Sequence, residues 1–225
     1  MGSFTGFTDA TIDFFWELRF NNNREWMEQN RDRYKRVLKE PFEDFVEVLS
    51  KVFEAQIKKD LRWSISRINR DIRFSKDKSP YRSNRWIASK HSYTKGTEWR
   101  FTPEFFFELS PESYSYGMGI YSAPPAYIQL YRKKIDSNPA AFAALIKKMK
   151  KHPEFKLVGD AYKRVANPNE YSEEMMTWYK KKGLAVMVER PLDELAFSAE
   201  LPTFLVEEWK KILPLYEYLN EIVVE

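Results

Sequence analysis

Apolar residues recur every three or four positions along the first quarter of the chain, which predicts amphipathic helices there. After Thr8, a stripe that includes Ile12 and Phe15 ends near the three asparagines at 21–23, and an asparagine is a suitable N-cap for a second helix. Pro41 suits the first turn of a further helix. The strongest helical stripe of the chain follows it: Phe42, Phe45, Val46, Leu49, Val52, Phe53 and Ile57.

The middle of the chain changes to a two-residue alternation, which indicates strands. Residues 67–74 place Ile68 and Ile72 on one face, although Arg70 falls on the same apolar face. Residues 85–91 are a second predicted strand, and residues 104–109 and 114–121 form a predicted antiparallel hairpin. Gly117 and Gly119 share one face of its last strand, where glycine indicates a bulge, a bend or a close approach by another group.

Helical spacing returns after Pro124 and continues to the end of the chain. Residues 125–135, 139–149 and 173–183 are predicted helices, and residues 184–188 are a short apolar run typical of a buried strand. The last apolar stripe covers 205–223 and contains Pro214, which should kink or split the helix. The order of elements predicts one α+β domain over residues 4–225, with a mainly antiparallel sheet flanked by amphipathic helices.

Composition excludes several classes of protein. The chain has 225 residues, of which 43% are hydrophobic, but no apolar run approaches the ~20 residues that cross a membrane. The N-terminus lacks a signal-peptide pattern, and the absence of cysteine fits a cytoplasmic location. With only two histidines and no glycine-rich phosphate loop, the sequence predicts no metal site, no cofactor and no membrane partner. Enzymatic activity and oligomeric state stay open.

Positive charge is concentrated in residues 65–88. This stretch contains seven basic residues and two acidic residues, a net charge of +5 in a chain whose total is +4. Guanidinium and ammonium groups bind phosphate and carboxylate, so the stretch predicts a site for a small phosphorylated or carboxylated ligand. The predicted binding residues are Arg67, Arg70, Arg73, Lys76, Lys78, Tyr81 and Arg82, and the supporting residues are Asp71, Asp77, Gly117 and Gly119.

The same residues admit other interpretations. The arginines can pair with carboxylates and serve only to fix a strand. In a second interpretation the protein is a metal-assisted hydrolase, in which Asp71 and Asp77 are the acid–base or cation-binding groups. No spacing of residues specifies this chemistry, and the catalytic residues stay unassigned. A nucleic-acid partner would use further cations and aromatic rings: Trp86, Lys90, Tyr93, Lys95, Trp99 and Arg100. A protein partner would use the tyrosines of the second hairpin strand: Tyr114, Tyr116 and Tyr121.

Two motifs resemble a known family. They are Asn22-Asn23-Arg24-Glu25-Trp26 and the thirteen residues from Arg70 to Arg82, R-D-I-R-F-S-K-D-K-S-P-Y-R. Both resemble the family called domain of unknown function 2461, and the similarity extends to residues 117–121 and 132–135. Met27 departs from the phenylalanine usual after the tryptophan of the first motif. The resemblance implies a shared fold and a shared site, but it transfers no catalytic residue because the family has no established activity.

Overall fold

The structure is a computed structural model that describes residues 3–73, 76–91, 102–120, 123–167 and 169–222. Its fold class is α+β, with a mainly antiparallel sheet and amphipathic helices, as the sequence predicts. The helices are α1 (Asp9–Phe20), α2 (Arg24–Gln29), α3 (Arg31–Tyr34), the π-helical turn η1 (Lys35–Lys39), α4 (Glu40–Ile57), α5 (Pro125–Ser137), α6 (Pro139–Met149), α7 (Glu173–Tyr179) and α8 (Leu201–Asn220). The strands are β1 (Leu61–Ile65), β2 (Arg85–His91), β3 (Glu104–Leu109), β4 (Ser113–Ile120), β5 (Lys156–Val158) and β6 (Leu184–Pro191).

These strands form one sheet in the order β1-β2-β3-β4-β6-β5. β2 and β3 pair antiparallel with Arg85 opposite Leu109, and β5 pairs antiparallel with β6. The predicted strands at 85–91, 104–109, 114–121 and 184–188 are confirmed within three residues at each end, apart from Tyr121, which lies outside the described residues. Alternating burial along β3 confirms that every second side chain of this strand is buried.

The predicted strand at residues 67–74 is wrong. The first strand is β1, which ends at Ile65, and the chain then leaves the sheet. Among the described residues 67–73 only Asn69 keeps a β-bridge, with Tyr81, and Ile72 is 43% exposed instead of buried; Phe74 lies outside the described residues. The charge at Arg70 explains the error, because a guanidinium on the apolar face cannot be buried in a sheet core without a costly loss of hydration.

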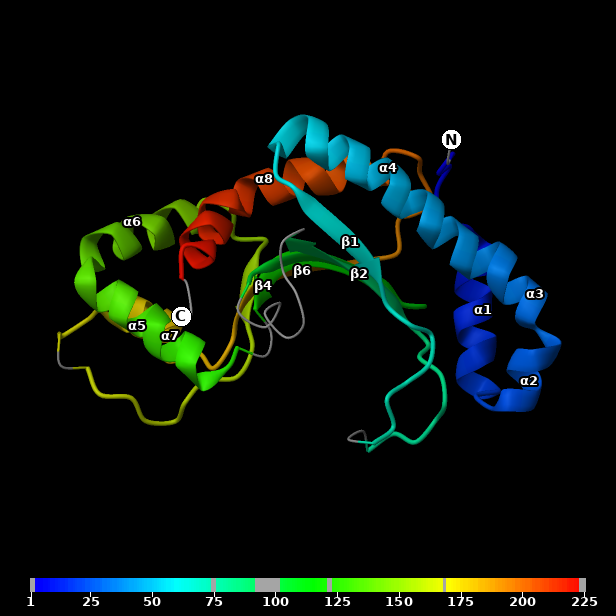
Figure 1. Ribbon diagram of the computed structural model, residues 1–225, viewed down its shortest axis with the longest axis horizontal. Coiled ribbons are helices and arrows are strands. Elements are labelled where there is room, and N and C mark those ends of the chain that lie inside the picture. Colours follow the sequence, from blue (N-terminus) through cyan, green and yellow to red (C-terminus); the bar gives the residue numbers. More distant parts are fainter. Residues whose placement is uncertain (1–2, 74–75, 92–101, 121–122, 168, 223–225) are drawn as a thin grey trace. The chain divides into compact units, whose positions relative to one another are not determined.

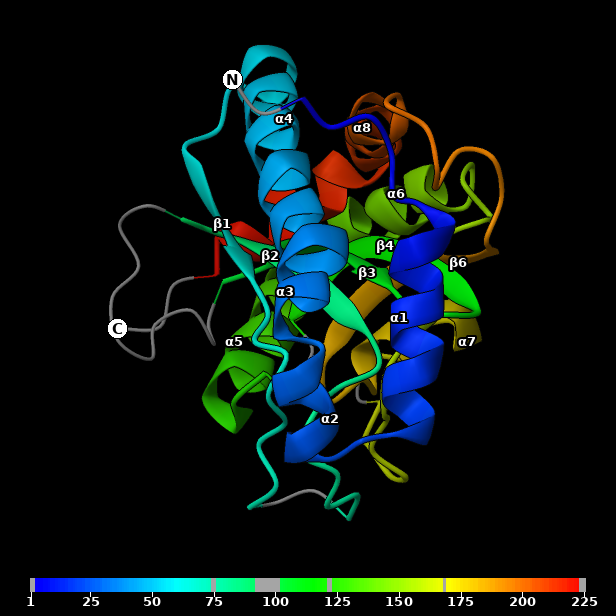
Figure 2. The same cartoon turned by 90° about the vertical axis from the view of Figure 1, so that its right-hand side faces the viewer.

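The described residues group into two compact units, and the single-domain extent of residues 4–225 stays a prediction. Unit 1 consists of Met1–Ser89, Phe106–Ser115 and Glu189–Glu207. Its core contains a cluster of phenylalanines in which Phe7 contacts Phe42 and Phe45, and Phe45 contacts Phe107. The turn η1, which joins α3 to α4, packs on α1 (Figure 2). At this contact the buried Thr11 hydroxyl donates to the Val37 carbonyl at 2.8 Å. These contacts fix the helical part of unit 1 to its strands.

Unit 2 consists of Lys90–Phe105, Tyr116–Val188 and Glu208–Glu225. Asn138 caps α6, as predicted, by accepting from the Ala141 amide at 3.1 Å. The Tyr127 hydroxyl donates to the Leu219 carbonyl at 2.9 Å, which joins α5 to the end of α8. Pro214 does not split the last helix, because α8 continues through it to Asn220.

Candidate functional site

The predicted anion-binding residues lie on a projecting loop of unit 1, which we call the basic hairpin (residues 67–82). The chain runs outward after β1 and returns before β2 (Figure 1). Its two arms are held by the Asn69–Tyr81 bridge and by two backbone hydrogen bonds of 2.8 Å, from Arg70 to Pro80 and from Arg82 to Ile68. The structure therefore brings Arg67, Arg70 and Arg82 together at the root of one hairpin.

Asn22 fixes the root of this hairpin. Its side-chain amide donates to the Tyr81 carbonyl at 3.0 Å and accepts from the Tyr81 amide at 3.0 Å. A side-chain amide matches a backbone amide in both donor and acceptor, so this pair satisfies two polar groups at once. The next residue, Asn23, caps α2 through the Trp26 amide. The two motifs that resemble the family are thus in direct contact, although nothing in the sequence marks Asn22 as a residue of the site.

Both acidic residues of the basic hairpin are occupied by its own arginines. Arg73 donates twice to Asp71, at 2.9 and 2.7 Å, and this pair lowers the pKa of Asp71 to about 2. Asp77 accepts from the Ser79 amide at 2.9 Å, which lowers its pKa, and it pairs with Arg70 at 3.0 Å. Such internal pairs shape the loop and neutralise two of its cations.

Three predicted cations form no ion pair with a carboxylate of the described residues: Arg67, Lys76 and Arg82, although the charge of Arg82 helps to lower the pKa of Asp71. Arg67 and Lys76 are exposed, and the Arg82 guanidinium stacks on the Trp86 ring with 4.6 Å to the ring centroid. Stacking restricts the guanidinium plane but leaves its N–H edges available to a ligand. Lys78 differs from these three, since its ammonium donates to the Ile72 carbonyl at 2.8 Å and so closes the loop.

Arg85 follows the hairpin and is the one basic residue of the stretch that the structure buries. It is only 6% exposed, and its guanidinium donates to the Tyr34 hydroxyl at 3.0 Å and lies 5.4 Å from the Phe42 ring centroid. This arginine therefore anchors the start of β2 to the helices of unit 1. Sequence spacing alone gave no signal that separates it from its exposed neighbours.

The two supporting glycines belong to unit 2 and serve the sheet. A Cβ atom at Gly117 would lie 2.0 Å from the Val186 carbonyl oxygen, and one at Gly119 would lie 2.2 Å from that of Leu184. Only glycine lets β4 come this close to β6. The predicted close approach is therefore made by a neighbouring strand, and the glycines have a structural role that needs no ligand.

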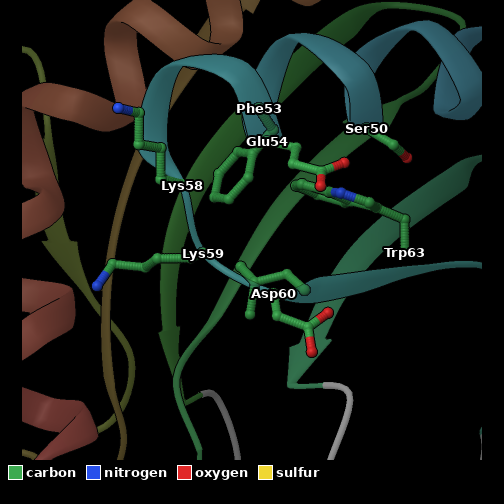
Figure 3. Close-up of a pocket in the computed structure, with 8 residues that line it drawn as sticks. Ser50, Phe53, Glu54, Lys58, Lys59, Asp60 and Trp63 are labelled. Atoms are coloured by element: carbon green, nitrogen blue, oxygen red, sulfur yellow. The ribbon is translucent and has the colours of Figure 1, made fainter.

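A pocket of about 440 Å³ opens elsewhere in unit 1, between the end of α4 and the start of β1 (Figure 3). Its lining residues are Ser50, Phe53, Glu54, Lys58, Lys59, Asp60, Leu61 and Trp63. None of the predicted anion-binding residues lines it. The pocket lies at the start of β1 and the basic hairpin follows the end of β1, so the two are separated by the length of this strand, roughly 17 Å.

The described residues give little support to a metal-assisted hydrolase, to a protein-binding surface or to a nucleic-acid-binding surface. These residues contain no group of three or more His, Asp or Glu side chains arranged for a metal ion. Tyr114 and Tyr116 are fully buried or nearly so, which corrects the prediction that they form a partner surface. Other residues considered for a partner lie outside the described part of the chain: Tyr93, Lys95, Trp99, Arg100 and Tyr121. None of the described helices is both long and apolar enough to cross a bilayer.

Fold and hairpin together define an α+β protein that presents a fixed, cation-rich loop. The model of the family described as conserved hypothetical protein (DUF2461) matches residues 10–218. The chain therefore belongs to this family, as the two motifs suggested. A search of curated proteins finds no match to the chain.

Proposed function

We propose that the chain binds an anionic ligand, a phosphorylated or carboxylated molecule, on the basic hairpin. The observation that carries this proposal is the charge left after internal pairing. Asp71 and Asp77 are both engaged by arginines, whereas Arg67, Lys76 and Arg82 have no acidic partner among the described residues. Arg67 and Arg82 lie together at the root of the hairpin, so their charges repel one another, and a bound anion relieves that repulsion.

The fixed geometry of the root supports the same proposal. Asn22 holds Tyr81 from one side, and the backbone bonds at Arg70 and Arg82 hold the two arms together. A ligand that binds here meets a surface that is already ordered, which lowers the entropic cost of binding. The absence of cysteine suits a reducing, cytoplasmic location, which is part of the proposal.

No observation favours the alternative of a metal-assisted hydrolase. Arg73 donates to both oxygens of Asp71, and Arg70 and the Ser79 amide engage Asp77. A carboxylate with a pKa of about 2, such as that of Asp71, is a weak base at neutral pH and a poor acceptor for a catalytic proton. The aspartates therefore fit the role of loop-shaping ion-pair partners.

Calorimetric titration with pyrophosphate and with citrate tests the proposal. The double variant Arg67→Gln/Arg82→Gln should lose binding with at most a small fall in melting temperature, because neither guanidinium forms an ion pair among the described residues and the contact that is removed is the stacking of Arg82 on Trp86. The control is Arg36→Gln/Lys51→Gln, which removes two exposed cations of unit 1 outside the hairpin, one of which, Lys51, pairs with Glu47 at 2.6 Å. Binding that survives in the hairpin variant, or that is lost equally in the control, would overturn the proposal.

A further inference from the structure

The root of the basic hairpin joins a polar cluster on the neighbouring strands through the contact of Arg82 with Trp86. The Arg82 guanidinium carbon lies 4.6 Å from the centroid of the Trp86 ring, and both residues are half-buried. A guanidinium that rests on an aromatic ring is held in one plane, and its second face can stack on another flat group. The Arg82–Trp86 pair is therefore a platform for a planar ring, next to the cations of the hairpin.

Two hydrogen-bond acceptors lie beside this platform. Glu108 of β3 is the Cα partner of Trp86 in β2, so the two side chains share one face of the sheet. The Asn84 side-chain amide donates to Glu108 Oε1 at 2.9 Å, which fixes both side chains. The remaining oxygens, Asn84 Oδ1 and Glu108 Oε2, have no hydrogen-bond partner within the described residues and stay accessible to solvent. The cluster therefore presents two acceptors at the edge of the platform.

A pair of neighbouring acceptors selects among flat nitrogen heterocycles. It matches an edge on which two N–H donors are adjacent, and among the common nucleobases guanine has such an edge, formed by its N1–H and its amino group. Adenine and cytosine place a ring-nitrogen acceptor beside the amino group, and uracil places its single N–H between two carbonyls. Those acceptors would face the Glu108 carboxylate without a proton between them, which is unfavourable.

We propose that the anionic ligand of the basic hairpin is a guanine nucleotide. Its phosphate binds to Arg67 and to the N–H edge of Arg82. Its base stacks on the Arg82 face that points away from Trp86, and the N–H edge of the base donates to Glu108 and Asn84. This inference rests on the proposed anion site, because the phosphate contacts bring the base to the platform. It adds a base-binding half to that site, with residues that no phosphate contact needs.

Calorimetric titration with GMP, AMP and ribose 5-phosphate tests the base-binding half separately from the anion site. Ribose 5-phosphate carries the sugar and phosphate without a base, so it reports on the anion site alone. GMP should bind about tenfold more tightly than AMP and about a hundredfold more tightly than ribose 5-phosphate, since stacking and edge recognition each contribute. Equal binding of all three compounds would leave the anion site standing and overturn the nucleotide inference. No binding of these compounds or of pyrophosphate would overturn both proposals.

The variant Glu108→Gln separates base recognition from phosphate binding and from folding. A glutamine keeps an oxygen for the Asn84 amide but loses the charge, so GMP should bind roughly tenfold more weakly while ribose 5-phosphate should bind no more weakly than before. Glu40→Gln is the matched control, because Glu40 is an exposed carboxylate of unit 1 without an ion pair among the described residues. Full GMP affinity in Glu108→Gln, or AMP binding as tight as GMP binding in the unaltered protein, would refute guanine recognition.

Discussion

Removal of the Asn22 side chain is the sharpest test of how the basic hairpin is held. Asn22→Ala deletes two hydrogen bonds of 3.0 Å each and leaves the Tyr81 N–H without its partner, while the Tyr81 carbonyl keeps the Arg70 guanidinium at 3.3 Å. A typical intramolecular hydrogen bond contributes about 1 kcal/mol net, so we expect the hairpin root to lose about 1–3 kcal/mol against local opening. The loss should be local, because Asn22 is only half-buried and lies outside the apolar core.

Amide hydrogen exchange followed by NMR measures this loss directly. The Tyr81 amide donates to Asn22, so its protection should fall roughly tenfold to a hundredfold in Asn22→Ala. The amides of Arg70 and Arg82, which close the hairpin, should follow in part. Asn21→Ala is the matched control, because the Asn21 side chain donates within α1 to Glu17 and does not reach the hairpin. Unchanged protection of Tyr81 in Asn22→Ala would refute the role given to Asn22.

Three further predictions concern the sheet and two titrating groups. Gly117→Ala should destabilise the protein by about 1–3 kcal/mol in urea unfolding, because its Cβ would meet the Val186 carbonyl oxygen at 2.0 Å. Burial raises the pKa of Glu104 to about 7 from 4.5, so the folded protein keeps a proton that the unfolded chain releases. The free energy of unfolding should therefore fall as pH rises from 4.5 to 7, and Glu104→Gln should remove that dependence. The Asp71 carboxyl should titrate near pH 2 when followed by NMR, and its pKa should rise toward the ordinary value of 3.8 in Arg73→Gln. Any stabilisation that this ion pair gives the folded protein should be lost only as the pH falls below 3.8 toward 2.

Much of the fold was predictable because local pattern and tertiary burial agree. The stripe after Pro41 became α4, in which Phe42, Phe45, Leu49 and Phe53 are buried. The β3 strand of the hairpin was predictable for the same reason, since its alternation matches burial of one face, whereas β4 is buried on both faces from Tyr116 to Ile120. Local signals were sufficient wherever the buried face of an element is continuous in sequence.

The error at residues 67–74 has a different cause. Ile68 and Ile72 alternate as in a strand, but only Ile68 is buried, and Ile72 lies on the exposed hairpin. Two apolar residues in a short window do not show whether a sheet edge is present to receive them. β1 was missed although Leu61, Trp63 and Ile65 alternate with polar residues, because the run is only five residues long and its apolar side chains are only half-buried at the edge of the sheet.

The concentration of charge in the sequence identified the candidate site, but it did not show which cations are paired internally and which are left for a ligand. The sequence alone could not show that Arg70 and Arg73 pair with Asp77 and Asp71, because such pairing depends on how the loop closes. It also could not show that Asn22, 59 positions from Tyr81, fixes the root of the hairpin. Long-range contacts of this kind have no local signature, although two distinctive motifs in one chain are a hint that they meet.

Side-chain NMR of the arginine Nε–Hε groups during titration with pyrophosphate tests anion binding at the basic hairpin most directly. The signals of Arg67 and Arg82 should shift with a common, saturable midpoint that weakens as salt is added, while those of Arg70 and Arg73, already paired with carboxylates, should move little. Uniform small shifts across all arginines, or shifts confined to Arg70 and Arg73, would contradict the proposed site and leave the hairpin as a structural ion-pair network.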